Sequence, residues 1–299
     1  MQSGRVTIRL RRMSTDSVEP AVVTLAALHA WHSGVARAFA HVAEADFALQ
    51  LAAALTRLVP LESIIISHER QGRPPLLLHQ QGVPEQYRDA IINRYFTCDY
   101  LLDPFCLAVE SGLAEGFYHL AEIAPDDFFS SEYYKNYYLK TNCGEDSYYI
   151  VDLLDQSKIT VCMYHGLSAG SFTQDQLGLL RSVEPVVRAL VGQFALAGLN
   201  SASTEVALSG IGQPQPSINQ QLEAAFINFG SALLSERERE AAHLILRGHS
   251  VKSAARVLEL SAETVRMHRK NLYAKLGINS QAELFALFIE GLTLSVATD

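Results

Sequence analysis

The sequence predicts an α+β protein with two domains, an amino-terminal α/β/α sandwich and a carboxy-terminal all-α domain of four helices. Three features predict this arrangement. Short apolar runs of strand length lie between helical segments in residues 21–199, as in a sheet covered by helices. Residues 200–217 are rich in Ser, Gly, Gln and Pro, the composition of a linker. Residues 218–299, with a core at 234–291, carry repeated helix-capping signals.

The first half of the amino-terminal domain combines helices with one hairpin. Residues 1–20, a basic segment interrupted by acidic residues and a proline, are predicted to be disordered. Residues 25–59 have a helical pattern, with a break expected near Ser33 and Gly34. Apolar runs at 64–66 and 76–78 flank a polar turn and predict a hairpin.

The second half repeats this pattern. Residues 84–96 and 131–140 are predicted helices, and residues 147–154 and 159–166 form a predicted second hairpin. A long amphipathic helix follows over 173–197, with Pro185 expected to kink or break it. Helices before and after a mostly antiparallel sheet are similar to GAF or PAS sensor domains, a likeness that names no ligand.

The carboxy-terminal helices are delimited by capping residues. Ser235–Glu238 and Ser280–Glu283 are capping boxes that open the first and fourth helices. Ser250 caps a short second helix, and Ser261 caps a third that runs to Leu276. Two short helices at this spacing, the second beginning polar and basic, suit a helix-turn-helix.

The run LSERERE…ILRGHSVKSAARVLELSAETVRMHRKNLYAKLGINSQAEL resembles the LuxR-type, or GerE-type, helix-turn-helix over about 58 residues without a gap. Its most specific part is ETVRMHRKNLYAKLGI. The chain departs from the family at Val251, where Asn is usual, and at Ala254, where Ile is usual. The resemblance implies a DNA-binding transcriptional regulator whose partner is double-stranded DNA.

The third helix of this module carries the side chains expected to read DNA. Arg266, Met267 and Lys270 lie on one face, because positions i, i+1 and i+4 fall within one arc of a helix. Arg and Lys can donate to guanine, and Met can contact a thymine methyl group. The resemblance places base contacts at these positions, although a solvated helix face is the plain alternative. Expected phosphate contacts are Lys252, Ser261, Thr264 and Arg269.

Charge separates the two parts of the chain. The whole chain has 24 Lys and Arg against 32 Asp and Glu, a net charge of −8. Residues 234–291 contain nine Lys and Arg, seven Glu and no Asp, so this module is mildly basic and the rest carries −10. DNA is therefore expected to approach one end of the molecule only.

Tyrosines mark a candidate effector site, because eleven of the twelve lie between Tyr87 and Tyr164. The spacing of Pro84 with Tyr87, Asp103 with Pro104, and Tyr118 resembles the autoinducer-binding domain of the LuxR family. Tyr87 lies three residues further from Asp103 than in that family, and tyrosines replace both expected tryptophans. The predicted effector-binding residues are Tyr87, Tyr95, Asp103, Tyr118 and Tyr134.

Plainer interpretations of these residues stay open. Asp103 followed by Pro104 is also an ordinary start of a helix. The tyrosine stripe at 133–138 also suits a core or a partner-facing surface. Tyrosine faces beside acids, which include Asp99, Glu132, Glu145 and Asp146, would suit an aromatic or cationic effector.

The favoured function is a transcription factor whose amino-terminal domain binds a small molecule and controls promoter binding by a homodimer. An inverted-repeat site is then expected, and RNA polymerase is a possible further partner. Leu284, Leu287 and Phe288 on the last helix are expected to form a second dimer contact. The alternative is a ligand-independent regulator whose amino-terminal domain only dimerises or binds a protein.

Other function classes lack their motifs. No G-x-S-x-G, P-loop, HExxH or G-x-G-x-x-G occurs, so an enzyme is not expected. A phosphoreceiver would need an acidic pair after its first strand, where this chain has SHER. The four cysteines lack metal-ligand spacing and are expected as buried thiols in a reducing cytoplasm, without metal or cofactor. No apolar run approaches the roughly 18 residues of a membrane helix.

Overall fold

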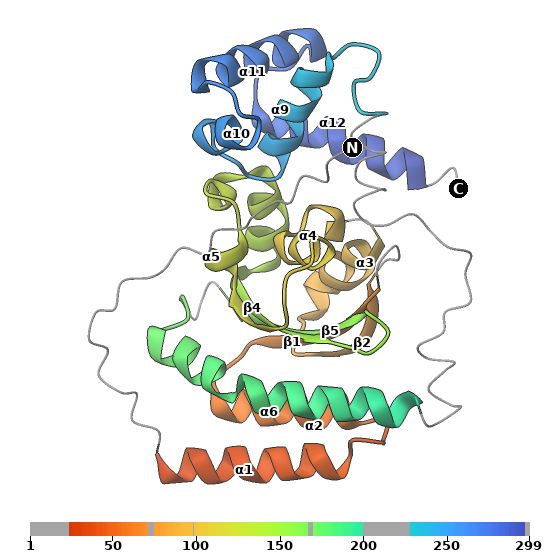
Figure 1. Cartoon of the computed structure of the whole chain (residues 1–299), viewed down its shortest axis with the longest axis vertical. Helices are drawn as coiled ribbons and strands as arrows, with labels where there is room; N and C mark the ends of the chain where they lie inside the picture. Colours follow the sequence, from red (N-terminus) through yellow and green to blue (C-terminus); the bar gives the residue numbers. More distant parts are fainter. Residues whose placement is uncertain (1–23, 71–74, 98, 167–169, 200–227, 297–299) are drawn as a thin grey trace.

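The computed structural model describes residues 24–70, 75–97, 99–166, 170–199 and 228–296. It confirms the predicted α+β class, with an antiparallel sheet between helical layers and a separate group of carboxy-terminal helices (Figure 1). The predicted disordered segment 1–20 and the predicted linker 200–217 lie outside these described residues. The predicted domain boundaries therefore stay predictions.

A five-stranded antiparallel sheet forms the centre of the amino-terminal domain, in the order β2-β1-β5-β4-β3. Both predicted hairpins are confirmed, because β1 pairs with β2 and β4 pairs with β5. The central strands β1, β4 and β5 are buried along almost their whole length, as expected for a sheet covered on both faces. The strands are β1 (Ser63–Glu69), β2 (Leu76–Gln81), β3 (Gly116–His119), β4 (Cys143–Asp152) and β5 (Lys158–Gly166).

Two long helices, α2 and α6, cover one face of the sheet, and a third, α1, packs on the outer side of α2 (Figure 1). They are α1 (Leu25–Ala40), α2 (Phe47–Leu58) and α6 (Gln174–Leu199), which continues through Pro185. The break predicted near Ser33 and Gly34 is wrong, because Gly34 lies inside α1 and the chain turns between His41 and Asp46 instead. Gly34 allows α1 and α2 to pack closely, because a Cβ at this position would lie 2.8 Å from the Cβ of Ala54 on α2.

Short helical turns and aromatic rings cover the opposite face. The helices predicted at 84–96 and 131–140 are present, but each is divided into turns of different pitch. The short α-helices are α3 (Tyr95–Thr97), α4 (Pro104–Glu110) and α5 (Leu120–Ile123). The remaining turns are η1 (Glu85–Tyr87), η2 (Asp89–Arg94), η3 (Asp99–Leu102), η4 (Phe128–Ser130), η5 (Tyr134–Tyr138) and η6 (Leu139–Thr141).

The carboxy-terminal module contains α9 (Glu236–Leu246), α10 (Val251–Val257), α11 (Ala262–Leu276) and α12 (Gln281–Val296). The predicted caps Ser235, Ser250 and Ser261 each accept a hydrogen bond from a backbone N–H of the helix that follows. Gly248 and Gly277 have φ of +85° and +68°, the left-handed conformation expected of a helix end. At the fourth helix the Glu283 carboxylate accepts from the backbone N–H of Asn279 instead of completing a box with Ser280.

The three cysteines among the described residues, Cys106, Cys143 and Cys162, are free and buried, in agreement with the prediction. Cys98 lies outside the described residues. Among the helices that the structure describes, none has an apolar stretch long enough to cross a membrane.

Two glycine substitutions test the packing of α1 on α2. Gly34→Ala places a methyl group against Ala54, whereas a Cβ at Gly178 on α6 would have no atom within 4 Å. We expect Gly178→Ala to raise the free energy of unfolding by about 0.5–1 kcal/mol through helix propensity. Gly34→Ala should instead lower it by about 1–3 kcal/mol through overpacking. Urea unfolding measures both, and a stabilised Gly34→Ala would contradict the helix contact.

Candidate functional site

The predicted DNA-reading face is exposed on α11, at the outer end of the molecule (Figure 1). Arg266 and Lys270 are exposed, and Met267 is 52% exposed although it is a large apolar side chain. The Arg266 guanidinium forms an ion pair of 2.9 Å with Glu263, one turn earlier on the same helix. This exposed pair is weak in water, so Arg266 can exchange it for a base or a phosphate.

The predicted phosphate contacts surround this face. Lys252 on α10 and Arg269 on α11 are exposed cations. The Ser261 hydroxyl caps α11 by accepting from the backbone N–H of Thr264, and the two hydroxyl groups lie 2.8 Å apart. The structure thus gives Ser261 and Thr264 a structural role in the helix start, beside the predicted phosphate role.

The predicted dimer contact on α12 needs correction. Leu284 and Phe288 are 0% and 1% exposed, because both pack into the core of their own chain. Phe288 lies edge-on to Phe229 with ring centroids 5.6 Å apart. Of the three residues predicted to meet a partner, only Leu287 is exposed.

Tyr95 and Asp103 are the two predicted effector residues that the structure brings into contact. The Tyr95 hydroxyl donates to the Asp103 carboxylate at 2.9 Å, and the thiol of Cys106 lies 3.3 Å from the same hydroxyl. The other carboxylate oxygen caps α4 by accepting from the backbone N–H groups of Phe105 and Cys106. Burial raises the pKa of Asp103 to about 6, although these hydrogen bonds oppose the shift.

The other three predicted effector residues lie at the margin of this aromatic core. Tyr87 and Tyr118 are partly buried and pack against it. The Tyr118 hydroxyl donates to the carbonyl of Ala114, and the Tyr134 hydroxyl donates to the carbonyl of Gly144 at 2.8 Å. The structure therefore does not gather all five predicted residues around one point.

Asp146 on β4 is a second buried carboxylate in the same core, and the sequence indicated it only as one of the acids near the tyrosines, not as a predicted effector-binding residue. It is 1% exposed and accepts from the Tyr138 hydroxyl at 3.0 Å. Burial first, and then the charge of Asp103, raise the pKa of Asp146 well above its usual value. Its signals in the sequence are its place among the tyrosines and its inward position on a strand, and alternation along β4 identifies that position once the register is known.

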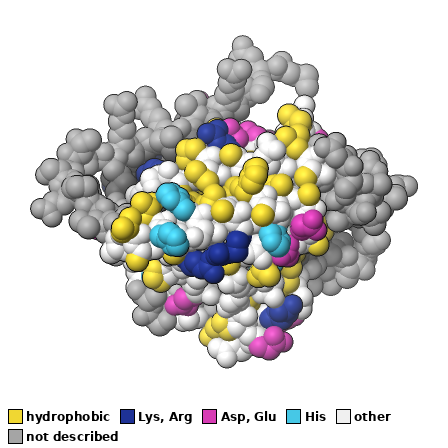
Figure 2. Space-filling model, turned by 90° about the horizontal axis from the view of Figure 1, so that it is seen from below, with side chains coloured by type: hydrophobic (Ala, Val, Ile, Leu, Met, Phe, Trp, Pro, Cys, Tyr) yellow, Lys and Arg dark blue, Asp and Glu magenta, His cyan; other side chains and the backbone are white. Residues whose placement is uncertain are grey.

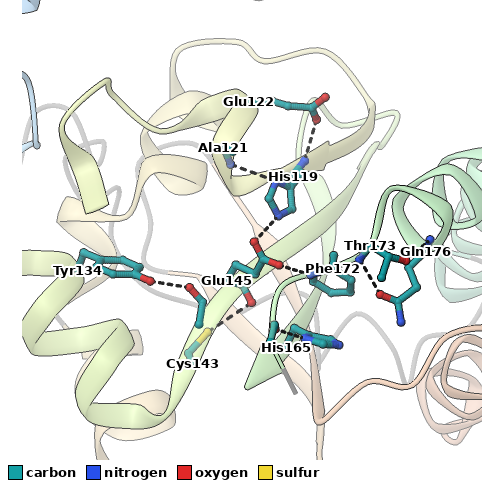
Figure 3. A network of polar contacts seen from close by, with 12 residues as sticks. His119, Ala121, Glu122, Tyr134, Cys143, Glu145, His165, Phe172, Thr173 and Gln176 are labelled. Atoms are coloured by element: carbon teal, nitrogen blue, oxygen red, sulfur yellow. Dashed lines mark hydrogen bonds and ion pairs between the residues drawn. The ribbon is translucent and has the colours of Figure 1, made fainter. Parts of the chain in front are cut away.

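The neighbouring Glu145 side chain forms a network that joins strand β4 to the helices (Figure 3). Its carboxylate bonds the imidazole of His119 at 3.0 Å and accepts from the backbone N–H of Phe172, just before α6. His119 in turn accepts from the backbone N–H of Ala121 and caps α5. This network therefore links the end of β4 to the start of α5 and to the segment before α6.

The segment after α5 docks on the DNA-binding module. The Asp126 carboxylate accepts from the backbone N–H of Ser250 at 3.0 Å and from its hydroxyl at 2.7 Å. The Asp127 backbone N–H donates to the carbonyl of Gly248 at 3.0 Å. We name these contacts the clamp. No sequence pattern indicates the clamp, because its partners lie 124 residues apart.

Phe128 continues the clamp into the aromatic core. Its ring lies 5.7 Å from that of Tyr138 and 5.8 Å from that of Tyr134. Its backbone lies so close to Gly248 that a Cβ on that glycine would be 2.8 Å from the Cα of Phe128. The aromatic core and buried residues of α9, α11 and α12 form one continuous hydrophobic cluster.

A cavity of about 390 Å³ opens beside the aromatic core, next to α4. Its wall includes Cys106 and Val109 of α4, together with polar side chains of the β4–β5 turn. Cys106, one of the lining residues, also contacts the Tyr95 hydroxyl through its thiol, and that hydroxyl donates to Asp103. Within the described residues, no three His, Cys, Asp or Glu side chains are placed to hold a metal ion.

The carboxy-terminal module matches a known family. Residues 232–288 match the family described as "Bacterial regulatory proteins, luxR family". A protein of Aeromonas salmonicida, named as an HTH-type transcriptional regulator in the exeN 3′ region, is 30% identical over 198 residues. That match covers 66% of this chain and 98% of the relative. The transcriptional regulatory protein UhpA of Escherichia coli strain K12 is 41% identical over 58 residues, which are 19% of this chain and 30% of UhpA.

Solved structures also resemble the chain. The VqsR LBD domain from Pseudomonas aeruginosa has 26% identity and a TM-score of 0.49, and the match covers 56% of this chain and 98% of that one. The crystal structure of Escherichia coli SdiA has 13% identity and a TM-score of 0.39, with 89% of this chain and 98% of that chain covered.

The raised pKa of Asp103 predicts a pH dependence of stability. The folded state holds the Asp103 proton more tightly than the unfolded state does, so protonated Asp103 stabilises the fold. This contribution to the free energy of unfolding is complete below pH 3.8 and is lost as the pH rises through about 6. The loss is on the order of 3 kcal/mol, at 1.36 kcal/mol for each pKa unit. We expect Asp103→Asn to remove this pH dependence, so that the free energy of unfolding of the variant falls less between pH 4 and pH 7 than that of the wild type. Urea unfolding across this range is the measurement, and parallel pH profiles would contradict the shift.

Proposed function

Because the chain belongs to the LuxR family of bacterial transcriptional regulators, we propose that its amino-terminal domain binds a small-molecule effector and thereby controls promoter binding by the carboxy-terminal module. The effector site in this proposal is the aromatic core around Tyr95, Asp103 and Asp146. The DNA-binding face is that of Arg266, Met267 and Lys270 on α11. These assignments rest on the geometry of the two surfaces and on the family resemblance of the motif.

The position of Phe128 is the observation that carries this proposal. Its ring packs against the tyrosines that surround the buried carboxylates, and its backbone touches the turn between α9 and α10. The rings of the aromatic core pack closely, with Tyr137 and Tyr138 2% and 0% exposed. An effector that enters this core must therefore displace rings. Displacement of the Tyr138 ring would shift the Phe128 ring that packs against it, and Phe128 directly follows the clamp residues in the chain.

The clamp is weak enough to act as a switch. Asp126 and Ser250 are near the surface, where each hydrogen bond contributes about 0.5–1.5 kcal/mol. The exposed guanidinium of Arg256 lies 4.0 Å from the same carboxylate and adds little. An effector that prefers one of two arrangements by a few kcal/mol can therefore open or close the clamp. In the closed arrangement the acidic Asp126 lies beside the start of α10, near the predicted phosphate contact Lys252.

A homodimer is part of the proposal, and the helical face of the amino-terminal domain supports it. Figure 2 shows hydrophobic side chains gathered on this face. Its large exposed apolar side chains on α1 include Leu25, Leu28 and Phe39, which are 82%, 42% and 61% exposed. Apolar surface of this kind is typical of association sites. Two modules held in a symmetric pair would read an inverted repeat.

Substitutions on α10 and α11 separate base reading from phosphate binding. We expect Lys270→Ala to weaken binding of the specific duplex much more than binding of unrelated duplex, by about 1–3 kcal/mol, because it removes a base contact. Lys252→Ala should weaken both alike and lower the salt dependence by about one counterion, because it removes a phosphate contact. Fluorescence anisotropy on the duplex that the protein selects from a randomised library measures both. Equal losses for Lys270→Ala would make Lys270 a phosphate contact.

The clamp predicts a gain of DNA binding when it is removed. We expect Asp126→Ala to strengthen binding of the selected duplex about three- to tenfold, because it removes two hydrogen bonds that hold α10 and a negative charge beside it. The control is Asp127→Ala, which removes the same charge one residue along the chain and keeps the hydrogen bonds to Ser250. The same anisotropy assay distinguishes them. Equal gains of affinity in the two variants would show that the loss of a negative charge, and not the loss of the hydrogen bonds to Ser250, strengthens DNA binding.

If Asp126→Ala leaves DNA binding unchanged, the amino-terminal domain does not act through the clamp. The supported function would then be the ligand-independent regulator, in which this domain only dimerises or binds a protein partner.

A further inference from the structure

Asp146 has an unused hydrogen-bonding atom in the interior of the amino-terminal domain. One carboxylate oxygen accepts from Tyr138, and the thiol of Cys162 lies 3.9 Å from that same oxygen. The other oxygen, Oδ1, is buried and has no hydrogen-bond partner. A buried carboxylate normally has its acceptors satisfied, because an unmade hydrogen bond leaves the cost of desolvating the group uncompensated.

Asp103 is close enough to Asp146 to add to its electrostatic cost. The negative charge of Asp103 raises the pKa of Asp146, in addition to the effect of burial. Among the described residues, no Lys, Arg or His side chain forms an ion pair with either carboxylate. Ionising two buried acids without a counter-charge is unfavourable, and a cation between them would favour their ionised forms.

Tyrosine rings enclose the same region. Tyr95 and Tyr137 have ring centroids 5.4 Å apart, and Tyr137 and Tyr138 are 5.5 Å apart in an edge-to-face arrangement. Tyr164 on β5 is the register partner of Asp146 on β4. Ring faces attract cations and stack on aromatic groups, and both attractions grow when water is excluded.

We propose that the effector is a small organic amine in its protonated form, whose ammonium group donates hydrogen bonds to Oδ1 of Asp146 and to the carboxylate of Asp103 between tyrosine rings. This inference rests on the proposed function, because it names the chemical class that the effector site accepts. The cavity lined by Cys106 is the candidate route of entry, since the Cys106 thiol lies 3.3 Å from the Tyr95 hydroxyl.

The chemistry of the site sets the selectivity. A carboxylic acid or a neutral lactone offers no positive charge to two buried carboxylates, and an anion would add a third negative charge. A quaternary ammonium ion has the charge but no N–H to donate to Oδ1. The predicted order is therefore primary amine first, quaternary ammonium second, and neutral or anionic compounds last.

Proton release gives a signature of this mode of binding. Burial raises the pKa of both acids, and that of Asp103 lies at about 6, so near pH 6 Asp103 is partly protonated. An incoming ammonium ion favours the ionised carboxylates, and binding must then release protons to the buffer. A neutral ligand in the same core releases none.

The test uses the full chain and three compounds of matched shape: phenethylamine, phenethyl alcohol and phenylacetate. Phenyltrimethylammonium, aliphatic amines of different length and an acyl-homoserine lactone complete the panel. We expect the primary amines to raise the melting temperature most and phenyltrimethylammonium less, whereas phenethyl alcohol, phenylacetate and the lactone should not raise it. Calorimetry at pH 6 in two buffers of different ionisation enthalpy should show net proton release on amine binding.

Variants show whether the buried acids are responsible. Asp146→Asn keeps the acceptor for Tyr138 and removes the charge, so we expect it to fold and to lose amine affinity about tenfold or more, together with proton release. Asp103→Asn tests the other carboxylate of the site, and it should also lose amine affinity. Asp175→Asn on the exposed start of α6 is the matched control and should leave both readouts unchanged.

Each outcome has one meaning. A shift by the lactone or phenylacetate, but by no amine, would overturn the inference and leave the proposed function standing. Unchanged amine binding in Asp146→Asn and Asp103→Asn would also overturn it. No shift by any compound would overturn the inference, and the Asp126→Ala experiment would then decide the proposed function separately.

Discussion

The close approach of Phe128 to Gly248 fixes how the two domains meet. Gly248 has a φ of +85° and no room for a Cβ, so glycine is required there by both conformation and contact. Phe128 is 1% exposed, with its ring among tyrosines and its backbone against the module. One residue therefore belongs to the packing of both domains. The proposed coupling of the two domains depends on this contact, because packed interiors transmit strain.

A second restriction lies within the sheet itself. Successive residues of β4 point to opposite faces, so Glu145 and Asp146 serve different layers. Glu145 joins His119 and the start of α6, while Asp146 enters the aromatic core. The two acids differ in their surroundings: hydrogen bonds and His119 lower the pKa of Glu145 against the effect of burial, whereas Asp146 has no positive partner among the residues described. The same strand thus carries a structural acid on one face and an unsatisfied one on the other.

Local signals predicted the carboxy-terminal module almost completely, because capping serines, helix-ending glycines and apolar spacing act within a few residues. The two hairpins were also predictable from alternation and turn residues. The break between α1 and α2 was not, because Gly34 is explained by Ala54 on another helix rather than by its neighbours in sequence. Leu284 and Phe288 were misinterpreted for a similar reason, since an apolar stripe does not reveal whether it faces its own chain or a partner. The clamp and the environment of Asp146 depend on tertiary contacts, which no local pattern encodes.

In the proposed function, the amino-terminal domain acts on the DNA-binding module through the contacts around Phe128. Hydrogen–deuterium exchange of the full chain, with and without its selected DNA duplex, can detect this coupling. The backbone N–H groups of Asp127 and Ser250 are the reporters, because both are donors in the clamp. Reciprocal coupling requires that DNA binding change the clamp if the clamp changes DNA binding. We expect faster exchange of these two groups in the DNA complex, while α11 becomes protected. Protection of α11 with unchanged exchange at Asp127 and Ser250 would contradict the coupling.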